Sequence, residues 1–217
     1  GDRLRLRQAL IASEVALTVL LLAASGLLIR TLIHLQTLPA GFNPTGVMTA
    51  KASLDDAAFR DAAVFRKLLT QSIAAMRQIP GVEQAAAGLS LPYERSLIMG
   101  ALPISDGKEA GQRVTTDETY ITPGYFETLQ IPLLAGRSFT GADGPTGQPV
   151  AIVNRTFARK FLHGTNPVGR HLDKNTLIVG MVEDVAMAPG IDVVAPLTGE
   201  QTVYIPAAQM DGKFLSV

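Results

Sequence analysis

One stretch of the chain has the glycine spacing of a phosphate-binding loop. It runs from Gly136 to Gly141 as Gly-Arg-Ser-Phe-Thr-Gly. Such a loop holds a nucleotide only when a lysine and a hydroxyl residue follow the second glycine, because they contact the phosphates and Mg²⁺. Ala142 and Asp143 occupy those two positions. The stretch is therefore interpreted as a turn, and no nucleotide site is expected.

His163, His171 and Asp173 are of residue types that bind metal ions. Metal ligands recur at recognisable spacings, such as four residues apart on one helix face. These three residues lie in a segment rich in glycine and proline, at unrelated spacings. This pattern favours solvent-exposed side chains, and no metal site is predicted. Because the chain has no cysteine, disulfides and thiolate metal sites are also excluded.

Two further positions could take part in catalysis. Ser90 lies in Gly-Leu-Ser-Leu, which lacks the second glycine of a nucleophile elbow. Glu183 and Asp184 follow an apolar run and resemble an acid pair. Adjacent residues of a strand point to opposite faces, so these two carboxylates would not share a proton. We therefore predict no enzyme and name no catalytic, cofactor-binding or metal-binding residue.

Composition narrows the classes of partner. The chain has 217 residues and a formal net charge of +0, which argues against a nucleic-acid partner because phosphate binding needs a basic surface. This length allows one ordinary domain or two small ones. The absence of cysteine does not choose a compartment. The first residue is Gly1, and the last four are apolar or small. Both ends are expected to have been cut from a longer protein.

The first forty residues have the pattern of a membrane span. Residues 9–29 are almost wholly apolar, and about 20 apolar residues are needed to cross the hydrocarbon core. A buried core helix and a cleaved signal peptide are the alternatives, although the run is longer than a signal peptide usually has. Three arginines (Arg3, Arg5 and Arg7) precede the span, whereas Arg30 alone follows it closely. This asymmetry predicts a cytoplasmic N-terminus.

Two features of this helix have possible functional meaning. Glu14 either contacts other helices of a bundle or is a carboxylate tolerated about two turns from the cytoplasmic arginines. The helical pattern also continues beyond the span, since no proline or glycine occurs between Leu27 and Leu38. Pro39, Gly41 and Pro44 are then expected to end it. Residues 31–38 are therefore predicted to form a rigid stalk above the membrane. We accordingly divide the chain into residues 1–38, with flank, span and stalk, and an outer domain of residues 39–217.

The first part of the outer domain is predicted to be a β-α-β unit. Residues 47–54 have the pattern of a strand, and Asp55 or Asp56 could cap the next element. Residues 57–78 show the three- and four-residue apolar spacing of a helix, which Pro80 and Gly81 would end. Residues 82–91 are predicted to be a second strand.

The rest of the chain mixes strands and helices without strict alternation, which predicts an α+β fold. Residues 92–113 are interpreted as loops marked by Pro103 and residues 105–107. Thr122 is a plausible N-cap for a short helix over 125–129, with Pro123 at its first position. Residues 131–137 are expected to form an extended apolar turn. The remaining expected elements are strands over 114–119, 150–153, 176–182 and 202–205, and a helix over 155–162.

An ordered set of segments resembles the periplasmic core domain of MacB-type (MacB/FtsX-like) ABC transporter permeases. Each segment alone is weak, but together they keep the family order over most of the chain. The segments are Arg7–Leu17, Tyr125–Asp143, Val150–Asn154, Asn166–Arg170 and Ile178–Val185. The sequence departs from the pattern at three turns: Gln130 and Glu183 stand where glycine is usual, and His163-Gly164-Thr165-Asn166 replaces Pro-Gly-x-Asp.

The resemblance implies a bacterial inner-membrane permease with its main domain in the periplasm. Its partners would be a cytoplasmic ATP-binding subunit or domain, other permease helices in a dimer, and a periplasmic adaptor. Such systems export antibiotics, peptides or toxins, or extract lipoproteins. The domain would have two lobes, about 45–92 and an inserted 93–210, and would be incomplete at its C-terminus. The glycosylation-like Asn154-Arg155-Thr156 has no meaning in a bacterium.

Two classes of function stay open. The first is a permease fragment that works mechanically, with a stalk passing the motion of membrane helices to the outer domain. The second is a membrane-tethered ligand-binding or sensor ectodomain. A binding site or active site would need polar groups that converge in a pocket. The sequence shows no such set, so the permease is preferred.

Overall fold

The computed structural model describes residues 2–37, 39–52, 61–94, 98–104, 111, 113–187, 197–198 and 201–210. The chain forms two compact units, Gly1–Pro39 and Ala40–Val217. The possible caps Asp55 and Asp56, the turn predicted at 105–107 and the C-terminal residues 211–217 lie outside the described residues.

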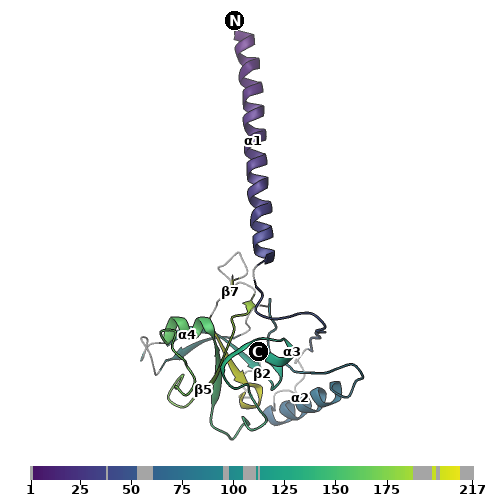
Figure 1. The fold of residues 1–217 in the computed structure, drawn as a ribbon, viewed down its shortest axis with the longest axis vertical. Coiled ribbons are helices and arrows are strands. Elements are labelled where there is room, and N and C mark those ends of the chain that lie inside the picture. The colour runs from purple at the N-terminus through teal and green to yellow at the C-terminus, as the bar shows by residue number, and fades with distance from the viewer. Residues whose placement is uncertain are drawn as a thin grey trace. The chain divides into compact units, whose positions relative to one another are not determined.

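The first unit is one unbroken helix, α1 (Asp2–Thr37), as Figure 1 shows. Its segment Arg7–His34 has a mean hydropathy of 2.1 and is long enough to cross a membrane. None of that segment is buried within the chain. A core helix of a soluble protein would bury such a surface, so α1 is a candidate membrane span and not a core helix. The helix continues through the predicted stalk to Thr37, and Leu38 is outside the described residues.

The second unit is built on a mixed six-stranded sheet with the order β1-β2-β8-β4-β5-β3. The pairs β2–β8 and β4–β5 are parallel, and the other neighbours are antiparallel. A two-stranded sheet joins β6 (Ala186–Met187) to β7 (Leu197–Thr198). The strands of the large sheet are β1 (Ile98–Pro103), β2 (Arg113–Ile121), β3 (Leu133–Gly136), β4 (Val150–Asn154), β5 (Leu177–Val182) and β8 (Thr202–Pro206).

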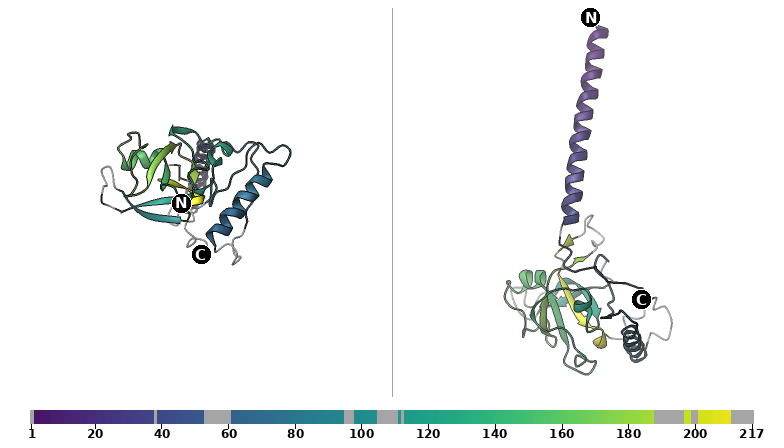
Figure 2. Two further views of the ribbon diagram at one scale, coloured as in Figure 1. Left: turned by 90° about the horizontal axis from the view of Figure 1, so that it is seen from below. Right: turned by 45° about the vertical axis from the view of Figure 1, so that its right-hand side comes forward.

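In the part of this unit that the structure describes, three α-helices and one short 3₁₀ helix accompany the sheet. They are α2 (Ala62–Met76), α3 (Tyr125–Thr128), α4 (Arg155–Phe161) and η2 (Ala207–Gln209). Helices α4 and α2 lie on opposite sides of the sheet domain, as the views in Figures 1 and 2 agree. The fold is therefore α+β, as the sequence predicts.

Successive residues of a strand point to opposite faces of the sheet, and this sheet buries apolar side chains on both faces. Ala151 and Val153 of β4 pack in one cluster with Phe157 of α4. Val150 and Ile152 pack in a second cluster with three residues of the α3 region, Tyr125, Phe126 and Leu129. A strand covered on both faces must be apolar throughout, and this explains the continuous run that identifies β4 in the sequence.

The neighbouring strand β5 changes face part-way along. Its register against β4 shifts by one residue between Ala151 and Ile152, where their partners are Ile178 and Gly180. Such a bulge inserts one extra residue into a strand and reverses the side chains beyond it. Ile178 therefore packs with Ala151 in one cluster, whereas Val182 packs with Ile152 in the other.

The prediction of a β-α-β unit is wrong for both of its strands. Residues 47–52 form no strand, because no described segment lies beside them as a ladder partner. Within 82–91 the sheet contact is a single bridge from Gly88 to Ile121. The Thr122 hydroxyl accepts from the Ala87 N–H at 2.8 Å, a bond that a neighbouring strand would otherwise supply. The helix itself is present as α2, capped by Asp61.

Three other predictions need correction. Residues 98–103, interpreted as a loop, form β1, which can end in Pro103 because this strand is at the edge of the sheet. Residues 133–136, expected to be a turn, form β3 and pair with β5. The N-cap of α3 is Gly124 in a left-handed conformation, because the Thr122 hydroxyl is bonded to Ala87 instead.

Candidate functional site

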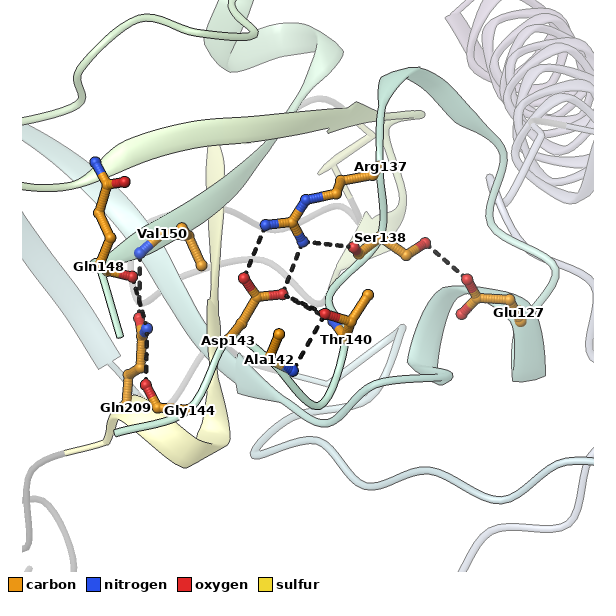
Figure 3. A network of polar contacts seen from close by, with 10 residues as sticks. All are labelled: Glu127, Arg137, Ser138, Thr140, Ala142, Asp143, Gly144, Gln148, Val150 and Gln209. Atoms are coloured by element: carbon orange, nitrogen blue, oxygen red, sulfur yellow. Dashed lines mark hydrogen bonds and ion pairs between the residues drawn. The ribbon is translucent and has the colours of Figure 1, made fainter. Parts of the chain in front are cut away.

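The glycine-spaced stretch 136–141 belongs to a turn closed by one ion pair. The two terminal guanidinium nitrogens of Arg137 donate to the carboxylate of Asp143, at 2.7 and 2.8 Å (Figure 3). This is the forked geometry of a strong arginine–carboxylate pair. The Thr140 N–H donates to the same carboxylate at 2.8 Å. Asp143 thus fills the turn from inside, at a position where a phosphate loop would carry a hydroxyl residue.

The loop that follows this turn is held by Gln209, which the sequence does not single out. Its side-chain amide donates to the carbonyl oxygens of Gly144 and Gln148, at 3.2 and 2.9 Å (Figure 3). Its side-chain oxygen accepts from the Val150 N–H at 3.1 Å. The connection from β3 to β4 is therefore fixed at both ends, which indicates a structural role.

The ion pair of Asp143 is expected to make the free energy of unfolding depend on pH. The hydrogen bonds from Arg137 hold the pKa of Asp143 below its ordinary value, although burial opposes this. A carboxylate with a lowered folded-state pKa adds stability above its unfolded pKa of about 3.9, and loses it as pH falls through the folded value. We expect Asp143→Asn to cost about 1–2 kcal/mol near neutral pH, since Arg137 is half exposed.

Urea unfolding at a series of pH values measures this effect. The difference in unfolding free energy between the unmodified protein and Asp143→Asn should shrink as the pH falls below about 4. A difference that stays constant into strong acid would contradict the assigned role of the ion pair.

A second assembly lies where the chain enters the sheet domain. We call residues 40–43 the connecting segment, because they directly follow the first unit in sequence. The Ala40 carbonyl accepts from the Ala186 N–H at 2.9 Å, and the Asn43 N–H donates to the Leu129 carbonyl at 2.9 Å. The Asn43 side chain also donates to Gln130 at 2.9 Å. The segment is therefore bonded at both of its ends.

The middle of the connecting segment packs closely. Gly41 has φ of 78°, and a Cβ there would overlap the carbonyl oxygen of Asp184. Phe42 packs on the core cluster of α3 and forms an edge-to-face pair with Tyr93, with ring centroids 5.6 Å apart. Only glycine combines this left-handed conformation with so close an approach. In the sequence Gly41 is only one of the residues that end the helical pattern, so its packing role is not predicted.

Residues 183–186 lie between the connecting segment and α4. The Asp184 carboxylate accepts from the N–H and from the hydroxyl of Thr156, at 2.8 and 2.9 Å. Glu183 forms an ion pair with Arg155 at 2.6 Å. The two acids therefore bind different partners, and both partners are in the first turn of α4.

The other candidate residues do not converge. Ser90 is buried, its hydroxyl is hydrogen-bonded to Thr119 at 3.0 Å, and its carbonyl accepts from the Tyr125 hydroxyl. Burial raises the pKa of Tyr125, so this phenol stays protonated as the donor. Among the residues that the structure describes, His163 and His171 included, no group of three His, Asp or Glu could hold a metal ion.

The side chains of two more candidate residues, Asp173 and Asn154, form hydrogen bonds that stabilise local structure. Asp173 accepts from the Asn175 and Thr176 backbones and from the Thr176 hydroxyl. Asn154 is buried and caps α4, with its side-chain oxygen accepting from the Phe157 N–H at 2.9 Å. The arrangement with the clearest functional meaning is therefore the bonded connecting segment.

A family model described as the MacB-like periplasmic core domain matches residues 15–216. The chain belongs to this family. Among curated proteins none matches the chain. The MacB-like domain also resembles solved structures. The periplasmic region of MacB from Actinobacillus actinomycetemcomitans is 15% identical, with a TM-score of 0.46, over 64% of this chain and 55% of that one.

Two other solved structures are similar to the MacB-like chain. The extracellular domain of the ABC-type transporter YknZ from Gram-positive bacteria is 17% identical, with a TM-score of 0.43, over 66% of this chain and 65% of that one. A permease domain from Porphyromonas gingivalis is 19% identical, with a TM-score of 0.36, over 66% and 59%. The chain spans less than two thirds of each of these three structures. Its membership of the MacB-like family rests on the family model.

Two of the three turns at which this MacB-like sequence departs from the resemblance, those of Gln130 and His163, have left-handed backbones. Gln130 stands where glycine is usual and has φ of 52°. His163 has φ of 57° in the turn after α4. Side chains other than glycine adopt this left-handed region at a cost of about 1–2 kcal/mol. At Gln130 the hydrogen bond to Asn43 of the connecting segment offsets part of that cost.

Proposed function

We propose that this chain is the extracytoplasmic domain, with one membrane helix, of an ABC transporter permease. In this proposal, ATP hydrolysis by a cytoplasmic subunit or domain moves the membrane helices of a dimer. The chain passes that motion outward and drives export or extraction of a substrate, and a periplasmic adaptor would act beyond it. The membrane would be the bacterial inner membrane, with the α1 N-terminus in the cytoplasm. Family membership, together with the bonded connecting segment, carries this proposal.

The proposed role is mechanical and not enzymatic. A chain that transmits motion needs stiff elements joined without a loose hinge, because a flexible linker absorbs displacement. Helix α1 is continuous from Asp2 to Thr37. Within the second unit, the connecting segment is hydrogen-bonded at Ala40 and at Asn43. A continuous helix and a bonded connecting segment support transmission.

A ligand-binding or sensor ectodomain has less support. One hollow of about 550 Å³ is lined by Ile104, Gly111, Pro149 and residues 173–176. The Asp173 carboxylate in this lining is already bonded to Thr176, so it is not poised for a ligand. The polar residues of this lining are the consecutive residues 173–176 of one turn, whereas recognition of a small molecule needs convergent polar groups.

The placement of the two units across a membrane is tested by labelling single cysteines, since the natural chain has none. In intact cells, a membrane-impermeant maleimide should label Lys174→Cys once it can reach the periplasm. It should label Gly1→Cys only after the inner membrane is opened. Labelling of Gly1→Cys in cells with an intact inner membrane would contradict the proposed orientation.

A further inference from the structure

Residues 183–186 contact two separate elements, the connecting segment and α4. Their backbone faces the connecting segment: the Ala186 N–H donates to the Ala40 carbonyl, and Gly41 packs on the Asp184 carbonyl. The Ala186 carbonyl also accepts from the Tyr93 N–H at 2.8 Å, and Tyr93 pairs with Phe42. Any displacement of the connecting segment must therefore strain or break its contacts with residues 183–186.

The side chain of Asp184 joins the same residues to α4. Its two carboxylate oxygens accept separately from the N–H and hydroxyl of Thr156, which is fully buried. The N-terminal turn of a helix has free N–H groups, and an acidic acceptor there is favoured by the helix dipole as well. The side-chain oxygen of Asn154 accepts hydrogen bonds from the Phe157 N–H, which is the next N–H of α4, and from the Thr202 N–H of β8.

The neighbouring ion pair is less suited to this role. Arg155 has half of its side chain exposed, and solvent weakens such pairs. The Asp184 bonds are partly buried, and hydrogen bonds to a charged acceptor are stronger than neutral ones. Of the two acids, Asp184 therefore makes the firmer connection to α4.

We propose that Asp184 is a positioning residue that couples the connecting segment to α4, so that the two respond to displacement together. This deepens the proposed function and rests on it, because it specifies the contact through which motion of the membrane helix would enter the sheet domain. A residue that merely capped α4 would stabilise that helix without affecting the connecting segment.

The chain provides a matched control for this contact. Asp173 accepts from the Thr176 N–H at 2.8 Å and from the Thr176 hydroxyl at 3.0 Å, which is the same pair of bonds. That pair closes a surface turn, and none of the described hydrogen bonds of Asp173 reaches residues 40–43 or 183–186. Thr156→Val and Thr176→Val thus remove the same hydroxyl–carboxylate bond in two places.

The test is hydrogen exchange of the whole chain in lipid nanodiscs, read by peptide mass spectrometry. Thr156→Val should speed exchange of the amides of Ala186 and Tyr93 by about fivefold, equivalent to about 1 kcal/mol. Thr176→Val should leave these amides unchanged. If Thr156→Val changes exchange only within α4, Asp184 is a helix cap and the proposed coupling is overturned.

A second variant keeps the test decisive if Thr156→Val does not fold. Asp184→Asn retains one acceptor oxygen, and it should show a smaller change in the same direction at Tyr93, which is remote from position 184 in sequence. An unchanged Tyr93 amide would overturn the proposal. Since these measurements need neither ATP nor a transported substrate, they can fail while the proposed transport function stands, and the reverse also holds.

Discussion

Replacing Gly41 with alanine is expected to release the connecting segment from the sheet domain. The Cβ would overlap the Asp184 carbonyl, which is backbone and cannot rotate away. The left-handed conformation of Gly41 adds about 1–2 kcal/mol for an alanine, and overpacking adds about 1–3 kcal/mol. The variant should therefore lose about 2–5 kcal/mol, either in global unfolding or in local opening of residues 40–43. Urea unfolding measures the loss in global stability, and hydrogen exchange of the Asn43 amide measures the local opening.

Gly46 is the matched control for this change. Its φ of 76° is almost the same, but an added Cβ would meet no atom within 4 Å. Gly46→Ala should therefore show only the conformational penalty of about 1–2 kcal/mol. It should leave exchange at Asn43 close to that of the unmodified protein. Equal effects of the two substitutions would show that the packing of Gly41 on Asp184 does not hold the connecting segment.

The sequence predicts best those elements whose signals are local. Helix α1 follows from a long apolar run without proline, and α4 is predicted directly after the apolar strand β4. Strand β4 is evident because a strand buried on both faces is apolar throughout. In these elements hydrophobic burial and intrinsic propensity favour the same structure.

The sequence predicts poorly where distant residues decide the structure. Residues 47–54 and 82–91 have strand-like composition, but strand formation depends on a partner that composition does not reveal. Strand β1 was hidden by Pro103, which is tolerated because it ends an edge strand. Thr122 has the pattern of a helix cap, yet its hydroxyl binds Ala87, 35 residues away in sequence.

The candidate site was the hardest part to predict. Asp184 was considered only as half of an acid pair, because its partner Thr156 is 28 residues away. From the sequence, Gly41 is predicted only to end the helix, since its close contact with Asp184 exists only in the folded chain. The one local signal was the cluster of Pro39, Gly41 and Pro44, which marks a sharply defined backbone and not only the end of a helix.

Breaking α1 at its outer end is expected to abolish transmission of motion. Leu35 follows His34, the last residue of the candidate span, and lies in the final turns of α1. A proline there removes one helical hydrogen bond and clashes with the preceding turn, at a cost of about 3 kcal/mol. Because the change lies beyond the apolar span, insertion and expression should persist. Leu35→Ala, which preserves the helix, is the matched control.

The most direct test of the account measures the distance between two copies of the sheet domain in the complete transporter. With Lys174→Cys as the single cysteine of each chain, spin labels report this distance in nanodiscs with and without a non-hydrolysable ATP analogue. The account predicts a distance change on nucleotide binding that Leu35→Ala retains and Leu35→Pro loses, while ATP hydrolysis continues. The same nucleotide-dependent change in Leu35→Pro would contradict it, because motion would then reach the sheet domain without an intact α1.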